Sequence, residues 1–130
     1  MTNRLALETA LRNFSDPANR EAYLKLYDPA CVLHGYPGVE PGLPSIRAFF
    51  EALWAAFPDV RITAEDFVEQ GDKLACRFVC RGTHRGVAPT DRPIEFGGMT
   101  ILAFRDGRCV ERWSQADFLT VLRQMGAVSL

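Results

Sequence analysis

Apolar residues recur every three to four positions through the first part of the chain, the spacing of amphipathic helices. Residues 7–14 show it, and Ser15-Asp16-Pro17 then supplies an N-cap followed by proline at the first position of a second helix. A short apolar stretch at 31–34 leads into a loop rich in glycine and proline, 35–44, whose last residue opens a third helix. The second helix carries Tyr23, Leu26 and Tyr27, and the apolar face of the third is formed by Ile46, Phe49, Phe50, Leu53, Trp54 and Phe57.

From residue 60 onward apolar and polar positions alternate, which is the period of a strand with one buried face. The predicted strands and turns, in chain order, are 60–65, a turn at Gln70-Gly71-Asp72, 74–81, 94–105, a hairpin turn at Asp106-Gly107, and 108–113. A last amphipathic helix follows and ends at Gly126. Because helices come first and strands later, we predict an α+β fold, with an antiparallel sheet, in a single domain over residues 1–130.

The long strand at 94–105 is apolar on both of its faces. In a small antiparallel sheet, helices can cover only one face, so a second apolar face indicates contact with another protein surface. We therefore predict a homodimer. One face carries Phe96, Gly98, Thr100, Leu102 and Phe104, and the other carries Met99, Ile101 and Ala103.

Composition narrows the classes of partner. Fifteen basic residues face sixteen acidic ones with no block of like charge, so no footprint for nucleic acid or an anionic membrane is visible. No apolar run has the length of a membrane span, and the Met-Thr-Asn-Arg start lacks the apolar core of a signal peptide, so a cytoplasmic protein is expected. The four cysteines form no C-x-x-C pair and the two histidines are far apart, so no metal site is expected.

Short motifs in this order along the chain resemble the SnoaL-like polyketide cyclase family. The motifs are Ala56-Phe57-Pro58-Asp59, Gly82-Thr83-His84-Arg85-Gly86, Pro89-Thr90-Asp91-Arg92, Arg105-Asp106-Gly107-Arg108 and Asp117-Phe118-x-x-x-Leu122-Arg123-Gln124-x-Gly126. The resemblance covers nearly the whole chain. It implies the nuclear transport factor 2-like fold, in which a strongly curved sheet wraps a helix to make a cone with a deep apolar pocket.

The resemblance also implies a chemistry. In the cyclases an aspartate removes an acidic proton next to a carbonyl, and the enolate closes a ring on a second carbonyl without a cofactor. The aligned position of that aspartate is Ser114, and a histidine of the family falls at Thr100. Neither residue titrates near neutral pH, which argues against the family's own aldol mechanism in this chain. Limonene epoxide hydrolase shares the cone, but its two aspartates and arginine would fall at Phe78, Cys80 and Ser114, which argues against epoxide hydrolysis.

The remaining titratable and aromatic candidates can each serve structure or function. His34 and His84 are the only imidazoles, the side chain that titrates nearest neutral pH, and His84 shares the parity of an apolar strand face. Ser114 and Asp117 have the spacing of a helix capping box, and Asp117 is also a candidate base. We assign His34 and Asp117 as candidate catalytic residues, and the candidate ligand-binding residues are Tyr36, Trp54, Phe78, His84, Thr100, Trp113 and Ser114.

Two functions from different classes follow. The first is a cofactor-independent enzyme that cyclises or isomerises a polyketide-like or other apolar carbonyl metabolite by acid–base chemistry. The second is a non-catalytic ligand-binding or dimerisation module of the same fold, which the serine at position 114 favours. A histidine–carboxylate contact inside a closed cavity would favour catalysis, and a cavity with only apolar side chains would favour binding.

Overall fold

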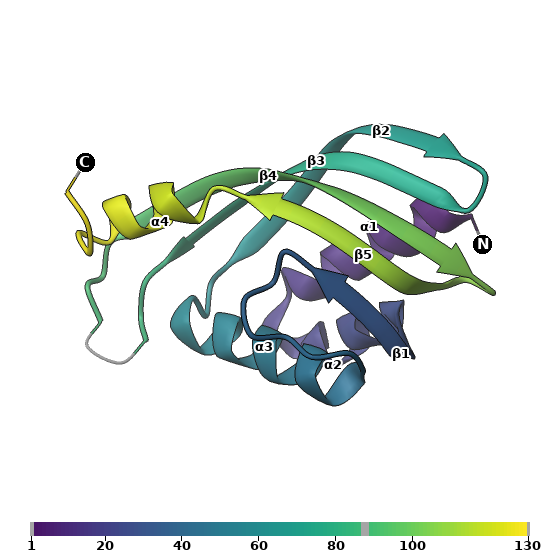
Figure 1. Ribbon diagram of the computed structural model, residues 1–130. Helices are drawn as coiled ribbons and strands as arrows, with labels where there is room; N and C mark the ends of the chain where they lie inside the picture. The colour runs from purple at the N-terminus through teal and green to yellow at the C-terminus, as the bar shows by residue number, and fades with distance from the viewer. Residues whose placement is uncertain (1, 87–88, 130) are drawn as a thin grey trace.

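The computed structural model describes residues 2–86 and 89–129, and it shows helices packed beneath one face of a curved five-stranded sheet (Figure 1). A C-terminal helix lies at the far end of the two longest strands (Figure 1). The helical elements are α1 (Asn3–Phe14), the 3-10 turn η1 (Pro17–Asn19), α2 (Arg20–Tyr23), the 3-10 turn η2 (Leu24–Leu26), α3 (Leu43–Ala56) and α4 (Phe118–Gln124). The strands are β1 (Tyr27–His34), β2 (Arg61–Gln70), β3 (Lys73–Thr83), β4 (Pro93–Arg105) and β5 (Arg108–Ala116).

The sheet has the order β1-β5-β4-β3-β2 and is open, with β1 and β2 at its edges. The four later strands are antiparallel neighbours, and tight turns join β2 to β3 and β4 to β5, as predicted. β1 differs, because it pairs parallel to β5 with Leu33 opposite Arg112 and His34 opposite Trp113. The α+β class is confirmed, and the sheet is mixed rather than wholly antiparallel. The strand also begins earlier than the apolar stretch at 31–34 suggested, so Tyr27 lies in β1 and not in the second helix.

The two faces of the sheet have different environments. On β4 the side chains of Phe96, Thr100 and Leu102 point toward the helices and are buried, whereas Met99 and Ile101 on the opposite face are 65% and 44% exposed. The predicted division of this strand into two faces is confirmed. We call the helix-covered side the inner face and the other side the outer face.

A glycine on β4 leaves room for one aromatic side chain on the inner face. A Cβ atom at Gly98 would be 2.5 Å from the Phe78 ring on β3 and 2.5 Å from the carbonyl oxygen of Gln115 on β5. Any larger residue would therefore push Phe78 off the strand. The missing side chain at Gly98 therefore leaves room for the Phe78 ring on the inner face.

The start of α4 corrects the predicted capping box. β5 continues to Ala116, so Ser114 is a strand residue and Asp117 itself is the N-cap of α4. Asp117 Oδ1 accepts from the backbone N–H of Thr120 at 3.0 Å, and Oδ2 accepts from the Thr120 hydroxyl at 2.6 Å. Within the described residues, no helix has both the length and the apolar character needed to cross a lipid bilayer.

Acid is expected to loosen α4 through this cap. The hydroxyl and then the backbone N–H of Thr120 lower the pKa of Asp117. Because the folded pKa lies below the unfolded value of about 4, the cap stabilises α4 fully above that value and is lost as the pH falls through the folded pKa. Hydrogen exchange of the α4 amides should therefore speed up, relative to the β4 amides, below about pH 4. Asp117→Asn should remove this acid response, and an unchanged response in that variant would contradict the role of the cap.

Candidate functional site

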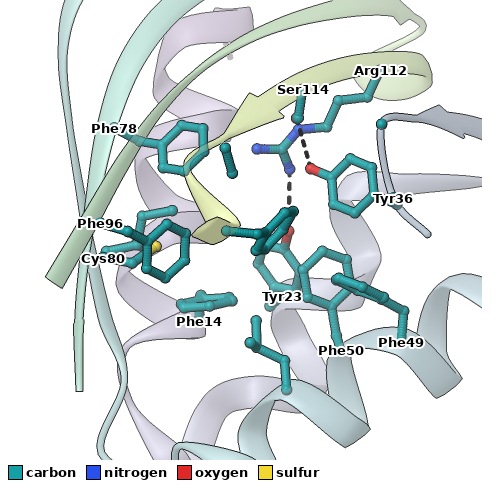
Figure 2. A pocket seen from close by; sticks show the side chains of 15 residues that line it. Phe14, Tyr23, Tyr36, Phe49, Phe50, Phe78, Cys80, Phe96, Arg112 and Ser114 are labelled. Carbon is teal, nitrogen blue, oxygen red and sulfur yellow. Dashed lines mark hydrogen bonds between the residues drawn. The ribbon is translucent and has the colours of Figure 1, made fainter. Parts of the chain in front are cut away.

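A cavity lies between α3 and the inner face of the sheet (Figure 2). It leaves about 50 Å³ for the centres of water-sized molecules, and one water needs roughly 10–15 Å³ of such space. In this state it therefore has room for about one small aromatic ring. Its apolar wall consists of Phe14, Phe49, Phe50, Leu53, Ile62, Phe78, Cys80, Phe96, Ala116 and Phe118, and its polar edge consists of Tyr23, Gly35, Tyr36, Arg112 and Ser114.

The turn after β1 brings Tyr36 over the inner face of β5. Gly35 adopts a φ of +84°, and a Cβ atom there would lie 2.0 Å from the carbonyl oxygen of Ser114. Only glycine combines this backbone conformation with so close an approach. The turn sets the Tyr36 hydroxyl 2.8 Å from Ser114 Oγ.

Three hydroxyl groups at this edge form a hydrogen-bonded chain with a fixed direction. Thr100 Oγ1 lies 3.0 Å from the backbone carbonyl oxygen of Trp113 and 2.9 Å from Ser114 Oγ. A carbonyl oxygen can only accept, so Thr100 donates its one proton there, Ser114 donates to Thr100, and Tyr36 donates to Ser114. The Tyr36 oxygen is therefore left with lone pairs on the cavity side and no free proton. It can accept a hydrogen bond from a bound molecule.

Arg112 projects from β5 into the centre of the polar edge, between Tyr23 and Tyr36 (Figure 2). The residue is only 3% exposed. Its Nε donates to Thr100 Oγ1 at 2.9 Å, and its Nη1 donates to the hydroxyl oxygens of Tyr27 at 2.7 Å and Tyr23 at 3.3 Å. Burial opposes its charge, but an arginine does not lose its proton at ordinary pH. The guanidinium is therefore charged at any ordinary pH.

The two tyrosines beneath Arg112 are neutral. Their hydroxyl oxygens are 2.5 Å apart. Burial raises the pKa of Tyr23 and of Tyr27, and the opposing attraction of Arg112 is smaller than the effect of burial. Each tyrosine therefore keeps its hydroxyl proton at neutral pH.

The thiols near the cavity do not supply a nucleophile. All four cysteines are free and buried. Burial raises the pKa of Cys76, and it raises the pKa of Cys80, on the cavity wall, to about 12. Because only the thiolate is a strong nucleophile, both groups behave as small apolar side chains. No three His, Cys, Asp or Glu side chains in the part of the chain that the structure describes gather as they would around a metal ion.

Five of the seven residues predicted for binding lie in or beside the cavity. Tyr36, Phe78 and Ser114 line the cavity. Thr100 lies opposite Ser114 on the neighbouring strand β4, and the two hydroxyl groups are hydrogen bonded. Trp54 packs beside the wall against Phe14 and Phe50, and its Nε1 is buried with no hydrogen-bond partner among the described residues.

His84 is a buried histidine that holds a loop. Its Nδ1 lies 3.3 Å from the backbone nitrogen of Thr90 and 3.1 Å from the Thr90 hydroxyl. The backbone N–H can only donate, so Nδ1 accepts the hydrogen bond from Thr90. The ring packs against Phe57 rather than lining the described cavity wall.

Two other predicted positions lie on the wrong side of the sheet for this cavity. His34 stacks on Trp113 with ring centroids 5.3 Å apart, and its Nε2 lies 2.6 Å from Glu111 Oε2. The His34 and Glu111 side chains are 44% and 41% exposed on the outer face. Alternation along β5 explains the correction, since Arg112 and Ser114 face inward and Glu111 and Trp113 must face outward. The predicted base Asp117 is likewise an exposed cap outside the described wall.

The sequence reasoning missed Arg112 and Tyr23, the two donors at the centre of the polar edge. Arg112 has the same strand parity as Ser114, so an inward Ser114 requires an inward Arg112. That parity was the available signal. Tyr23 carried no comparable signal, because its position depends on how α2 meets the sheet.

A family model of the SnoaL-like polyketide cyclases matches residues 6–125. The chain belongs to the SnoaL-like polyketide cyclase family. Among solved structures, IdmH, a candidate polyketide cyclase from Streptomyces antibioticus, is 32% identical, with a TM-score of 0.80 over 97% of this chain and 99% of IdmH. A candidate polyketide cyclase from Acidithiobacillus ferrooxidans is 25% identical, with a TM-score of 0.81 over 98% of this chain and 96% of that one.

The fold is also found in a protein described by another chemistry. AclR from Streptomyces galilaeus, a candidate hydroxylase, has a TM-score of 0.84 over 98% of this chain and 97% of AclR, at 19% identity. No curated protein sequence matches the chain. The resemblance to the SnoaL-like family is thus confirmed, while the fold by itself leaves the reaction open.

Two positions that the family resemblance assigns to titrating side chains meet in this structure. The resemblance implies an aspartate at position 114 and a histidine at position 100, and the hydroxyl oxygens of Ser114 and Thr100 are 2.9 Å apart on the inner face. The charge at this edge of the cavity comes instead from Arg112.

Proposed function

We propose that this protein is a small-molecule enzyme that isomerises or cyclises an apolar carbonyl metabolite in the cavity, without a cofactor. The observation that carries the proposal is an aromatic cavity with a single polar edge, at which Arg112 donates and Tyr36 accepts. A carbonyl in equilibrium with its enol offers the matching pair, an oxygen acceptor and a hydroxyl donor. Polyketide-like skeletons carry several such groups on an apolar frame.

The charge on Arg112 supports a catalytic role. Removing a proton beside a carbonyl places negative charge on the oxygen, and a fixed positive group in a buried site stabilises that charge as it develops. The described wall of the cavity holds no carboxylate and no imidazole. In this proposal the protein therefore stabilises the enolate, and the proton leaves to a water molecule rather than to an aspartate.

A non-catalytic binding module remains the second candidate. It is favoured by the hydroxyl groups of Ser114 and Thr100 at the positions that the family resemblance gives to an acid and a base. The same cavity and polar edge would then retain an apolar carbonyl compound without changing it. The two candidates differ in proton exchange at the carbon next to the carbonyl.

Acetophenone separates these candidates, because its one ring suits the cavity and its methyl protons exchange slowly in neutral heavy water. We expect the protein to bind it, as measured by ligand-observed NMR, and to speed deuterium exchange of the methyl group roughly 10²-fold, the lower range for one donor that stabilises an oxyanion. Ser114→Asp should speed it further, because the variant adds a carboxylate at the cavity edge. Binding with exchange at the buffer rate, in the wild-type protein, would select the binding module.

His34→Gln is the matched control on the outer face. We expect acetophenone exchange to be unchanged in this variant, because His34 and Glu111 lie across the sheet from the cavity. A loss of exchange on His34→Gln, with the fold intact by circular dichroism, would instead place the chemistry on the outer face.

We also propose that the outer face forms a homodimer. Met99 and Ile101 are exposed at its centre, next to Trp113 across the β4–β5 pair. Its rim carries both signs of charge, including the ion pair between Arg77 and Asp66. A patch with an apolar centre and mixed charges at its rim is self-complementary when two copies meet about a two-fold axis.

Light scattering at micromolar concentration should give the mass of two chains. Ile101→Glu should give a monomer, because two carboxylates would be buried near the axis. Leu119→Glu is the matched control, since Leu119 is 49% exposed on α4, away from this face. A monomeric wild-type protein, or a dimer that survives Ile101→Glu, would reject this interface.

A further inference from the structure

The cavity contains a buried positive charge with no negative partner. None of the ion pairs between described residues includes Arg112. The partners of its Nε and Nη1 are the hydroxyl groups of Thr100, Tyr23 and Tyr27, and the tyrosines are neutral. Buried charges in proteins are normally paired or neutralised, and an arginine cannot lose its proton at ordinary pH. The Tyr36 ring lies near the guanidinium, with 5.9 Å between Cζ and the ring centroid, but it carries no net charge. A bound molecule can therefore supply the missing counter-charge.

The hydrogen-bond inventory of this edge shows what such a molecule must offer. Arg112 Nη2 carries two protons and has no hydrogen-bond partner among the described residues. Tyr23 and Tyr27 share one hydrogen bond with each other, so one of their two hydroxyl protons is left over. Tyr23 lines the cavity, so donation from Tyr27 to Tyr23 leaves the free proton of Tyr23 on the cavity side. Arg112 Nη2, which belongs to a charged group, and the Tyr23 hydroxyl are thus two donors that lack an acceptor.

The rest of the wall determines the frame that carries the acceptor. Apart from the polar edge, the cavity is surrounded by aromatic and aliphatic side chains, among them Phe50, Phe78 and Phe96. A strongly hydrated ion such as phosphate would lose its water against these rings without replacement. An oxyanion attached to a flat, unsaturated carbon frame satisfies both parts of the site.

We propose that the cavity selects its ligand in the ionised form, as a phenolate- or enolate-type oxyanion held by Arg112 Nη2 and the Tyr23 hydroxyl. This inference rests on the proposed function and specifies its substrate class, a carbonyl compound acidic enough to bind as its enolate or phenolate. The positive charge favours the ionised oxygen over the neutral one. The Tyr36 oxygen, which can only accept on this side, receives a neighbouring hydroxyl of the same ligand.

A pair of probes that differ only at the oxygen tests this selection. 4-Nitrophenol can ionise, and its phenolate absorbs visible light, whereas 4-nitroanisole has the same ring but cannot ionise. We expect the protein to lower the apparent pKa of bound 4-nitrophenol by at least one unit, which corresponds to a tenfold preference for the phenolate. At a fixed pH, addition of protein should therefore increase the phenolate absorbance.

Two variants assign the effect to its donors. Arg112→Met should reduce the phenolate preference about 10- to 100-fold, the range for a hydrogen bond to a charged group. Tyr23→Phe should reduce the phenolate preference about tenfold, which is the lower end of the same range. Arg105→Met removes an exposed positive charge at the β4–β5 hairpin and should leave the preference unchanged. If Arg112→Met does not fold, the wild-type probes and Tyr23→Phe decide the question.

The outcomes separate this inference from the proposed function. If 4-nitroanisole binds and bound 4-nitrophenol keeps its solution pKa, the oxyanion inference is wrong while the cavity still binds apolar molecules. If neither probe binds at millimolar concentration, both proposals fail. A phenolate preference that persists in Arg112→Met and in Tyr23→Phe would place the anion elsewhere and also overturn the inference.

Discussion

Replacing Arg112 with methionine is expected to make the protein more stable while removing its preference for an ionised ligand. An unpaired guanidinium gives up its hydration on folding, and replacing buried charged groups by apolar residues of similar volume is often stabilising by about 1–4 kcal/mol. The hydroxyl groups around Arg112 keep other partners, since Tyr23 and Tyr27 remain bonded to each other and Thr100 to Ser114. No acceptor in this network is stranded by the substitution. We therefore expect a gain in unfolding free energy within that range.

Urea unfolding of the two proteins, followed by circular dichroism, measures this gain. Arg105→Met again serves as the control, and a surface change of this kind should alter the free energy of unfolding by less than about 0.5 kcal/mol. A clear loss of stability in Arg112→Met would mean that the guanidinium is kept for the hydroxyl network rather than for a ligand. A gain would show that Arg112 lowers the free energy of unfolding, as expected of a residue that serves ligand binding.

Local patterns were sufficient for most of the fold. The change of period near residue 60 separated helices from strands, and Asp106-Gly107 marked the hairpin, where both residues have positive φ angles of 52° and 79°. These features depend on neighbours in sequence. The parallel pairing of β1 with β5 could not be predicted in this way, because Leu33 and Arg112 meet only after the whole sheet has formed. The short apolar stretch at 31–34 carried no information about its partner.

The candidate site shows the same limit in more detail. Strand parity correctly directed Phe78 and Thr100 inward. Ser114 and Trp113 were both assigned to the ligand, although adjacent residues on one strand face opposite sides. A predicted strand that continued through Ser114, with strict alternation, would have removed Trp113 and brought in Arg112. The contact of His34 with Glu111 required the β1–β5 register, which the sequence did not provide.

Substitution of Gly35 with alanine is expected to produce the largest loss of stability among the variants considered. The backbone has a φ of +84°, and the new Cβ would lie 2.0 Å from the Ser114 carbonyl oxygen. The left-handed conformation alone costs an alanine about 1–2 kcal/mol. The contact forces the turn away from β5, which also separates Tyr36 from Ser114. We expect a total loss of at least about 3 kcal/mol in the free energy of unfolding, together with weaker binding of 4-nitroanisole.

Gly38→Ala separates the two causes of that loss. Gly38 lies in the same loop with a φ of +75°, but a Cβ there would meet no atom within 4 Å. It therefore carries the backbone cost without the contact, and we expect a loss of only about 1–2 kcal/mol with unchanged probe binding. The difference between the two variants measures the approach of the turn to β5. Equal losses would show that the contact at Ser114 relaxes freely, in which case the turn does not hold Tyr36 against the cavity edge.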